Sequence, residues 1–181
     1  MEAAESARAL SAVDGAVRST PDRHAPVTSY DLALLLHLVG AIGFFSGLAI
    51  AAAAHLAALR RDRPGEIAAV LALARTGVLV VGAATAVVLG SGLWLVSKTG
   101  RSLRDGWIAL SLALLVVAGV LGALGGRKAK RARLLAGRRA VEPRPDPAIQ
   151  ALLRDRVSLA ANVGAAAAAL GVLLLMVWRP G

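Results

Sequence analysis

The sequence contains no cysteine and few aromatic or methionine residues, and these shortages exclude whole classes of chemistry. Without cysteine the chain cannot form a disulfide, a zinc–thiolate site or an iron–sulfur cluster. A copper site typically needs several Met, His or Cys ligands. The chain offers few such side chains for this purpose: Met1, Met176, His24, His37 and His55.

Charge is missing from four long stretches, although Asp, Glu, Lys and Arg make up 18% of the chain. Each stretch has at least 21 residues without a charge, over 32–59, 76–97, 106–126 and 157–178. About 20 apolar residues suffice for a helix to cross the roughly 30 Å hydrocarbon core of a bilayer. The stretches lack the alternation of polar and apolar residues that a membrane strand requires. The sequence therefore predicts an all-α protein, an antiparallel four-helix transmembrane bundle.

The predicted organisation is a polar tail followed by one membrane domain. Residues 1–29 have neither the basic start nor the apolar core of a signal peptide, and their composition predicts a disordered tail. Residues 30–181 form the membrane domain, with a basic cytoplasmic loop over 127–154. Its helices are expected at about 30–59, 65–97, 105–126 and 155–178.

The distribution of basic residues predicts the orientation of the chain. Two connections that must share one side, 60–63 and 127–156, carry thirteen Lys and Arg, whereas the opposite side carries seven. Short basic loops stay in the cytoplasm, so both termini are expected outside the plasma membrane. Trp and Tyr favour membrane interfaces, and each predicted helix has one such residue at its outer end: Tyr30, Trp94, Trp107 and Trp178. The net charge of +10 thus reflects membrane topology, and no nucleic-acid partner is expected.

The stretch Arg127–Arg139 indicates a lipid partner, because seven of its thirteen residues are basic. Each charge contributes roughly 1 kcal/mol near an anionic membrane surface. Two interpretations stay open: the charges only fix the topology, or the stretch binds anionic lipid of the cytoplasmic leaflet.

Arg75 lies near the inner end of the second predicted helix. This helix is about 50 Å long at 1.5 Å per residue, which exceeds the thickness of the hydrocarbon core. Counted inward from Trp94, its membrane part begins near Gly77. Arg75 is then expected at the inner interface, where its side chain can reach water. The alternative places Arg75 inside the bundle as a counter-charge or a substrate contact.

Glycines at four-residue and eight-residue spacings predict where helices pack. Membrane helices associate by close contact at small residues, because lipid is as apolar as leucine. Gly43 and Gly47 supply such a face on the first helix, and Gly82 and Gly90 on the second.

His37 lies inside the first apolar stretch, on the same arc of the helix as Gly40, Gly47, Ala51 and His55. This face is expected to point into the bundle, where an imidazole can find a partner. Three interpretations stay open for His37. It is a neutral histidine bonded to a neighbouring helix, or a haem or metal ligand, or a proton relay or substrate contact.

The remaining intramembrane polar residues favour structural roles. His55 lies about 27 Å from His37 along the helix, near the basic interface. Asn162 is expected to form a hydrogen bond between helices. The membrane segments contain no pair of carboxylates and no Ser-His-Asp set, and Ser46 has no residue on its helix that would activate it. An enzymatic activity stays open, with no catalytic residue assigned.

Four segments carry a resemblance to a known family: "LLLHLVGAIGFFSGLAI", "RTGVLVVGAATAVVLGSGLWLV", "WIALSLAL" and "LLLMVWRPG". Over about residues 30–181 the chain resembles a bacterial family of predicted integral membrane proteins, a domain of unknown function. That family is similar to the CopD-type copper-resistance membrane proteins and to the four-helix bacterial protoporphyrinogen oxidase, which place a histidine in an early membrane helix. The resemblance implies a four-helix bundle and a role for His37, without implying an activity.

Three functions are consistent with these features. The first is a small multi-pass membrane protein with a structural or accessory role. The second is a haem-binding redox protein with His37 as an axial ligand. The third is a small transporter or an accessory subunit, packed as a homo-oligomer or within a larger membrane complex.

Overall fold

The computed structural model describes residues 28–142 and 144–178, and every regular element in these ranges is a helix. In chain order the helices are α2 (Ser29–Ala58), α3 (Pro64–Lys98), α4 (Gly106–Arg138), α5 (Pro147–Leu153) and α6 (Arg156–Trp178). Four helical stretches are long and apolar enough to cross a membrane: α2, α3, α4, and α5 with α6. The predicted all-α class with four apolar helices is confirmed. The tail expected over residues 1–29 lies, up to residue 27, outside the described residues.

Local sequence signals explain several helix ends. The Thr28 hydroxyl accepts a hydrogen bond from the Asp31 amide, and the Asp31 carboxylate accepts one from the Thr28 amide. This reciprocal capping box begins α2. Asp146 begins α5, because its Oδ1 accepts a hydrogen bond from the amide two residues later at 2.8 Å. After α3, Gly100 adopts a φ of 65°, which glycine tolerates without strain.

The third long helix extends further than the sequence analysis predicts. The prediction ends it near residue 126 and places 127–154 in a loop, whereas α4 continues through the basic stretch to Arg138. Ala, Leu, Arg and Lys are good helix formers, and the stretch contains no proline to end the helix. A second part of the expected loop forms the short helix α5. The helix thus continues beyond the first charged residue after the apolar stretch, Arg127.

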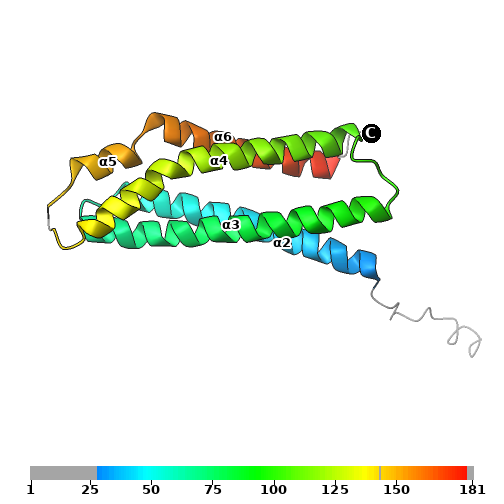
Figure 1. Cartoon of the computed structure of the whole chain (residues 1–181), viewed down its shortest axis with the longest axis horizontal. Coiled ribbons are helices and arrows are strands. Elements are labelled where there is room, and N and C mark those ends of the chain that lie inside the picture. Colours follow the sequence, from blue (N-terminus) through cyan, green and yellow to red (C-terminus); the bar gives the residue numbers. More distant parts are fainter. Residues whose placement is uncertain (1–27, 143, 179–181) are drawn as a thin grey trace, which may run out of the picture.

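The helices pack as two antiparallel pairs, α2 with α3 and α4 with α6 (Figure 1). The pairs touch mainly through α3 and α4. One end of the molecule contains a cluster of buried apolar side chains: Ala58, Ile67, Leu71, Ala132, Ala136, Ile149 and Leu153. Figure 1 shows α3 and α4 closest at this end, beside α5, and further apart toward the loop that connects them. The fold therefore consists of two helical hairpins joined at the end that carries the basic residues.

Small residues at seven-residue intervals are buried along the long helices. They are Ala33, Gly40, Gly47 and Ala54 on α2, Gly77, Ala84 and Ser91 on α3, and Ser111, Ala118, Gly125 and Ala132 on α4. A seven-residue repeat keeps one face of a helix against its neighbour, as in left-handed coiled coils. Small side chains on that face let two membrane helices approach closely.

Candidate functional site

His37 lies on α2, and its imidazole reaches across to α3. Its Nδ1 is 3.1 Å from the Val88 carbonyl oxygen and 3.3 Å from Ser91 Oγ. A carbonyl oxygen can only accept, so the Nδ1–H tautomer donates to Val88 and leaves the Nε2 lone pair free. The Ser91 hydroxyl donates in turn to the Val87 carbonyl at 2.6 Å. His37 therefore joins the two helices of the first pair.

Glycines on both helices make this contact possible. A Cβ added to Gly92 would lie 3.1 Å from Cε1 of His37, so the imidazole rests against the α3 backbone. One turn along α2, a Cβ on Gly40 would lie 2.8 Å from Cγ2 of Val88. The backbones of α2 and α3 thus approach each other closely enough for the imidazole to reach a carbonyl of the other helix.

An open apolar groove of about 400 Å³ lies near this contact. It is lined by Ala33, Leu36, Ala86, Val87, Gly90, Ser91 and Trp94. At 100° per residue, Ala86 and Gly90 lie on one flank of the α3 contact face, whereas Val88 and Gly92 lie on the other. The imidazole of His37 and the groove are therefore on opposite sides of the contact between α2 and α3.

His55 lies five helical turns from His37, at the basic end of α2. Its Nε2 is buried and has no hydrogen-bond partner within residues 28–142 and 144–178, although the backbone of Leu153 lies near the ring. The structure does not bring His55 and His37 together. Among the described residues, no three His, Cys, Asp or Glu side chains are grouped as a metal site would require.

Asn162 belongs to a contact within the second helix pair. The Ser158 hydroxyl of α6 donates to the Gly125 carbonyl of α4, and both residues are buried. One turn further along α6, the carboxamide oxygen of Asn162 lies directly over Gly125, in the space that any side chain there would occupy. Asn162 was predicted to lie between helices, whereas Ser158 was not predicted; the seven-residue spacing of Ser158 and Ala165, both buried on α6, could have revealed it.

The other singled-out residues lie in different surroundings. Arg75 is exposed on α3. Gly47 packs tightly against α3, and a Cβ on Gly43 would be 3.4 Å from that of Ala84. By contrast, a Cβ on Gly82 or on Gly90 would meet no atom of the described chain within 4 Å. The contact face of α3 follows the seven-residue repeat of small residues, and Gly82 and Gly90 lie on the opposite side of the helix.

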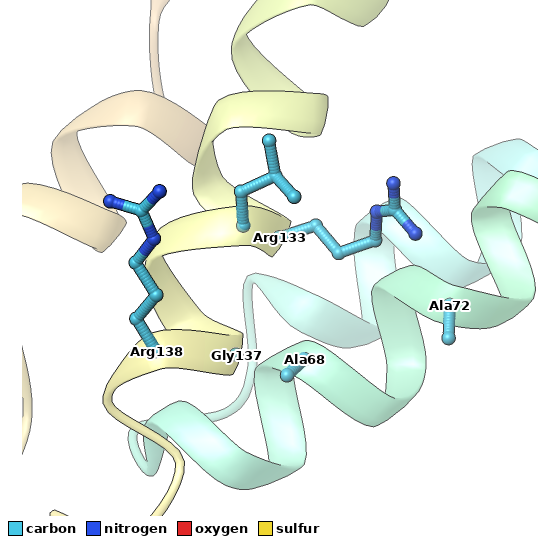
Figure 2. A pocket seen from close by; sticks show the side chains of 6 residues that line it. Ala68, Ala72, Arg133, Gly137 and Arg138 are labelled. Atoms are coloured by element: carbon cyan, nitrogen blue, oxygen red, sulfur yellow. The ribbon is translucent and has the colours of Figure 1, made fainter.

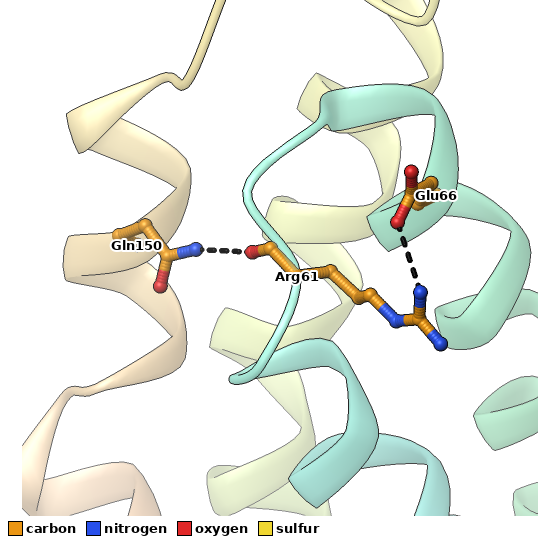
Figure 3. A network of polar contacts seen from close by, with 3 residues as sticks. All are labelled: Arg61, Glu66 and Gln150. Carbon is orange, nitrogen blue, oxygen red and sulfur yellow. Dashed lines mark hydrogen bonds and ion pairs between the residues drawn. The ribbon is translucent and has the colours of Figure 1, made fainter.

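Polar contacts fasten α5 to the basic end. Arg139 forms an ion pair of 2.6 Å with Asp146, whose side chain is only 5% exposed. Gln150 of α5 donates to the Arg61 carbonyl at 2.7 Å, and the Arg61 guanidinium pairs with Glu66 at 3.2 Å (Figure 3). These contacts connect α5 both to α4 and to the turn between α2 and α3.

Most of the basic side chains that follow the third membrane segment lack such partners. Lys128 pairs with Asp155 at 2.8 Å, and Arg139 pairs with Asp146. No acidic residue occurs between positions 106 and 141. Within the part of the chain that the structure describes, five basic side chains of this stretch have no carboxylate within 4.0 Å: Arg127, Lys130, Arg131, Arg133 and Arg138.

The family of the chain follows from comparison with known proteins. A family model described as "Predicted integral membrane protein (DUF2269)" matches residues 31–180, which cover the four membrane helices except for the first two residues of α2. The chain belongs to this family. No curated protein and no solved structure matches it. The resemblance to a family of predicted integral membrane proteins of unknown function is confirmed, and the membership agrees with the four apolar helices of the chain.

Proposed function

We propose that this DUF2269 protein, an integral membrane protein with four apolar helices, has a structural or accessory role and not an enzymatic one. The proposal is supported by the hydrogen bonds of the polar side chains within the helices, which are made to backbone carbonyls. His37 bonds to the backbone of α3, and Ser158 bonds to the backbone of α4. Ser111 and Thr85 donate to carbonyls of their own helices. Hydrogen bonds between helices, such as those of His37 and Ser158, help to hold particular helices together in lipid, where the hydrophobic effect does not drive their association.

The orientation is part of the proposal. The basic end, with α5 and the C-terminal part of α4, faces the cytoplasm, and both chain termini lie outside the plasma membrane of a bacterium. Thirteen basic residues against seven support this orientation. A cytoplasm-only fluorescent reporter and an export-dependent phosphatase, fused separately to the C-terminus, test it. We expect phosphatase activity without fluorescence, and fluorescence without phosphatase activity contradicts the orientation.

An accessory role requires partners, and the surface offers faces for them. Large apolar side chains are exposed on both helix pairs, including Ile42 at 68% and Val116 at 66%. The open flank of α3 at Gly82 and Gly90 would let another helix approach closely. A second copy or a larger membrane complex fits these faces. Chemical cross-linking in native membranes, followed by mass measurement, distinguishes a homo-oligomer from a complex with other chains.

A second candidate function is haem binding through His37, and one contact favours it. Metal-ligating histidines commonly donate their other ring N–H to a backbone carbonyl, as Nδ1 of His37 does to Val88. The resemblance to CopD-type membrane proteins and to the four-helix protoporphyrinogen oxidase points to the same residue. His37 would then supply Nε2 as an axial ligand.

An absorption spectrum distinguishes the two candidates. The full chain, purified in mild detergent, is expected to show no Soret band under the structural proposal. His37→Leu and His55→Leu should then both remain folded and differ only in stability. A Soret band that disappears in His37→Leu and persists in His55→Leu establishes the haem function instead and contradicts the structural proposal.

A further inference from the structure

A groove between α3 and α4 brings apolar surface next to two arginines. It has a volume of about 400 Å³ and is lined by Ala68 and Ala72 of α3 and by Arg133, Leu134, Gly137 and Arg138 of α4. Figure 2 shows the two guanidinium groups on opposite sides of α4, with Arg133 extending toward α3. The groove lies where the two hairpins meet.

Small residues keep the groove open. Ala68 and Ala72 present only methyl groups, and a Cβ on Gly137 would meet no described atom within 4 Å. Leu134 is 52% exposed and adds apolar surface to the wall. The groove is therefore open to a lipid headgroup between α3 and α4.

The charged side chains that line the groove are the two arginines. Neither Arg133 nor Arg138 has a carboxylate within 4.0 Å among the described residues, and no acidic side chain lines the groove. A guanidinium binds phosphate through charge-assisted hydrogen bonds in a planar geometry that suits a bidentate contact. The site thus combines two phosphate-binding side chains with an open, partly apolar wall.

The groove also lies at the depth of lipid headgroups. If the hydrocarbon part of α3 begins near Gly77, Ala72 lies about 8 Å below that boundary at 1.5 Å per residue. On α4, Arg133 lies about 10 Å beyond Gly126, the last residue before the basic stretch. Headgroups occupy a layer of about 5–8 Å on each side of the hydrocarbon core, and the long side chain of Arg133 can reach back into this layer from just outside it.

We propose that this groove is a binding site for the headgroup of one anionic phospholipid, whose glycerol phosphate lies in the groove against Ala68 and Ala72, within reach of the flexible side chains of Arg133 and Arg138. The inference rests on the proposed placement of the basic end at the cytoplasmic leaflet. It is more specific than attraction of the whole stretch Arg127–Arg139 to a charged membrane, because it requires the groove as well as the charge.

Native mass spectrometry of the full chain in detergent tests the site with added phosphatidylglycerol, phosphatidylcholine or inorganic phosphate. We expect one phosphatidylglycerol to bind preferentially. Arg133→Gln/Arg138→Gln should lower its affinity about tenfold, since each charge contributes a few-fold near an anionic lipid. The matched control is Arg127→Gln/Arg131→Gln, which removes two equally unpaired charges that do not line the groove and should change the affinity far less.

A second pair of variants tests the groove without changing charge. Ala72→Leu should fill the groove and lower phosphatidylglycerol binding, whereas Ala69→Leu, at an exposed position of α3 outside the groove, should not. Helix content and melting temperature without lipid confirm that each variant is folded.

Three results overturn the inference: equal losses in the two arginine pairs, unchanged binding in a folded Ala72→Leu, or binding of phosphatidylcholine or inorganic phosphate as strong as that of phosphatidylglycerol. Binding in detergent does not depend on orientation in the membrane. Failure of the lipid site and failure of the proposed topology are therefore distinguished by this experiment and the reporter fusions.

Discussion

Replacement of Gly47 by alanine should push α2 and α3 apart and destabilise the first helix pair. A Cβ at this position would lie 2.7 Å from the Gly77 carbonyl oxygen and 2.9 Å from the Val81 amide nitrogen. Both are backbone atoms, so no side chain can rotate away to relieve the overlap. Ordinary van der Waals contact begins at 3.4 Å, and the backbones would have to separate by about 0.7 Å to reach it.

The expected cost follows from two opposing effects. Overpacking a tight contact costs typically 1–3 kcal/mol, while alanine gains roughly 0.5–1 kcal/mol over glycine within a helix. The net loss in the free energy of unfolding should be about 1–2 kcal/mol. Gly82→Ala is the matched control, because its Cβ would meet no described atom within 4 Å. It should leave stability unchanged or raise it.

Unfolding by denaturing detergent in mixed micelles, followed by circular dichroism, measures both variants against the parent. The reasoning is refuted if Gly47→Ala unfolds at the same detergent fraction as the parent. It is also refuted if Gly82→Ala is the more strongly destabilised of the two. Either result would mean that α2 and α3 do not meet at Gly47 and Gly77.

Three further substitutions test the second helix pair and the basic end. Gly125→Ala should cost about 1–3 kcal/mol, because the new Cβ would displace the Asn162 carboxamide and lie 3.0 Å from the Ser158 carbonyl oxygen. The neighbouring Gly126→Ala should cost little, and equal effects in the same unfolding assay would contradict the contact. Ser158→Ala removes the hydrogen bond to the Gly125 carbonyl and should lower the free energy of unfolding by about 0.6 kcal/mol. The control Ser46→Ala, at an exposed position of α2, should leave stability unchanged. A Ser158→Ala variant as stable as the parent would contradict this hydrogen bond. Asp146→Ala removes both the N-cap of α5 and the ion pair with Arg139, at a cost of about 1 kcal/mol for the cap. Amide hydrogen exchange over residues 147–153 should be faster in this variant than in the parent, and should be unchanged in the control Glu142→Ala. Unchanged exchange in Asp146→Ala would refute its role.

The number and position of the membrane helices could be predicted from the sequence, because the absence of charge over 21 or more residues is a direct requirement of the hydrocarbon core. The end of α4 could not be predicted in this way. Charged residues predict where a helix leaves the membrane, whereas the end of the helix itself depends on the helix propensity of its residues. The stretch up to Arg138 is both highly charged and rich in good helix formers. The short helix α5 has a readable start at Asp146 and Pro147, which the prediction of a loop overlooked.

The candidate site could be predicted only in part from the sequence. His37 stands out as a titratable residue in an apolar stretch, but its partner is the Val88 carbonyl. Every residue has a carbonyl, so no sequence pattern identifies this one. The glycines of α3 illustrate a different difficulty. Gly82 and Gly90 form the more conspicuous spacing, whereas the contact uses Gly77 within a seven-residue repeat of small residues. Only the relative position of two helices decides which of two small-residue faces is buried.

The free energy of unfolding of His37→Leu tests the central claim most directly, which is that this histidine holds α2 against α3. The substitution removes the hydrogen bond to the Val88 carbonyl and should lower stability by about 0.6 kcal/mol, the average for such bonds in membrane proteins. Combined with Ser91→Ala, which shares the contact, its effect should be non-additive. Combined with His55→Leu, five turns away, it should be additive. A His37→Leu variant as stable as the parent, with effects that add in both combinations, would contradict the claim.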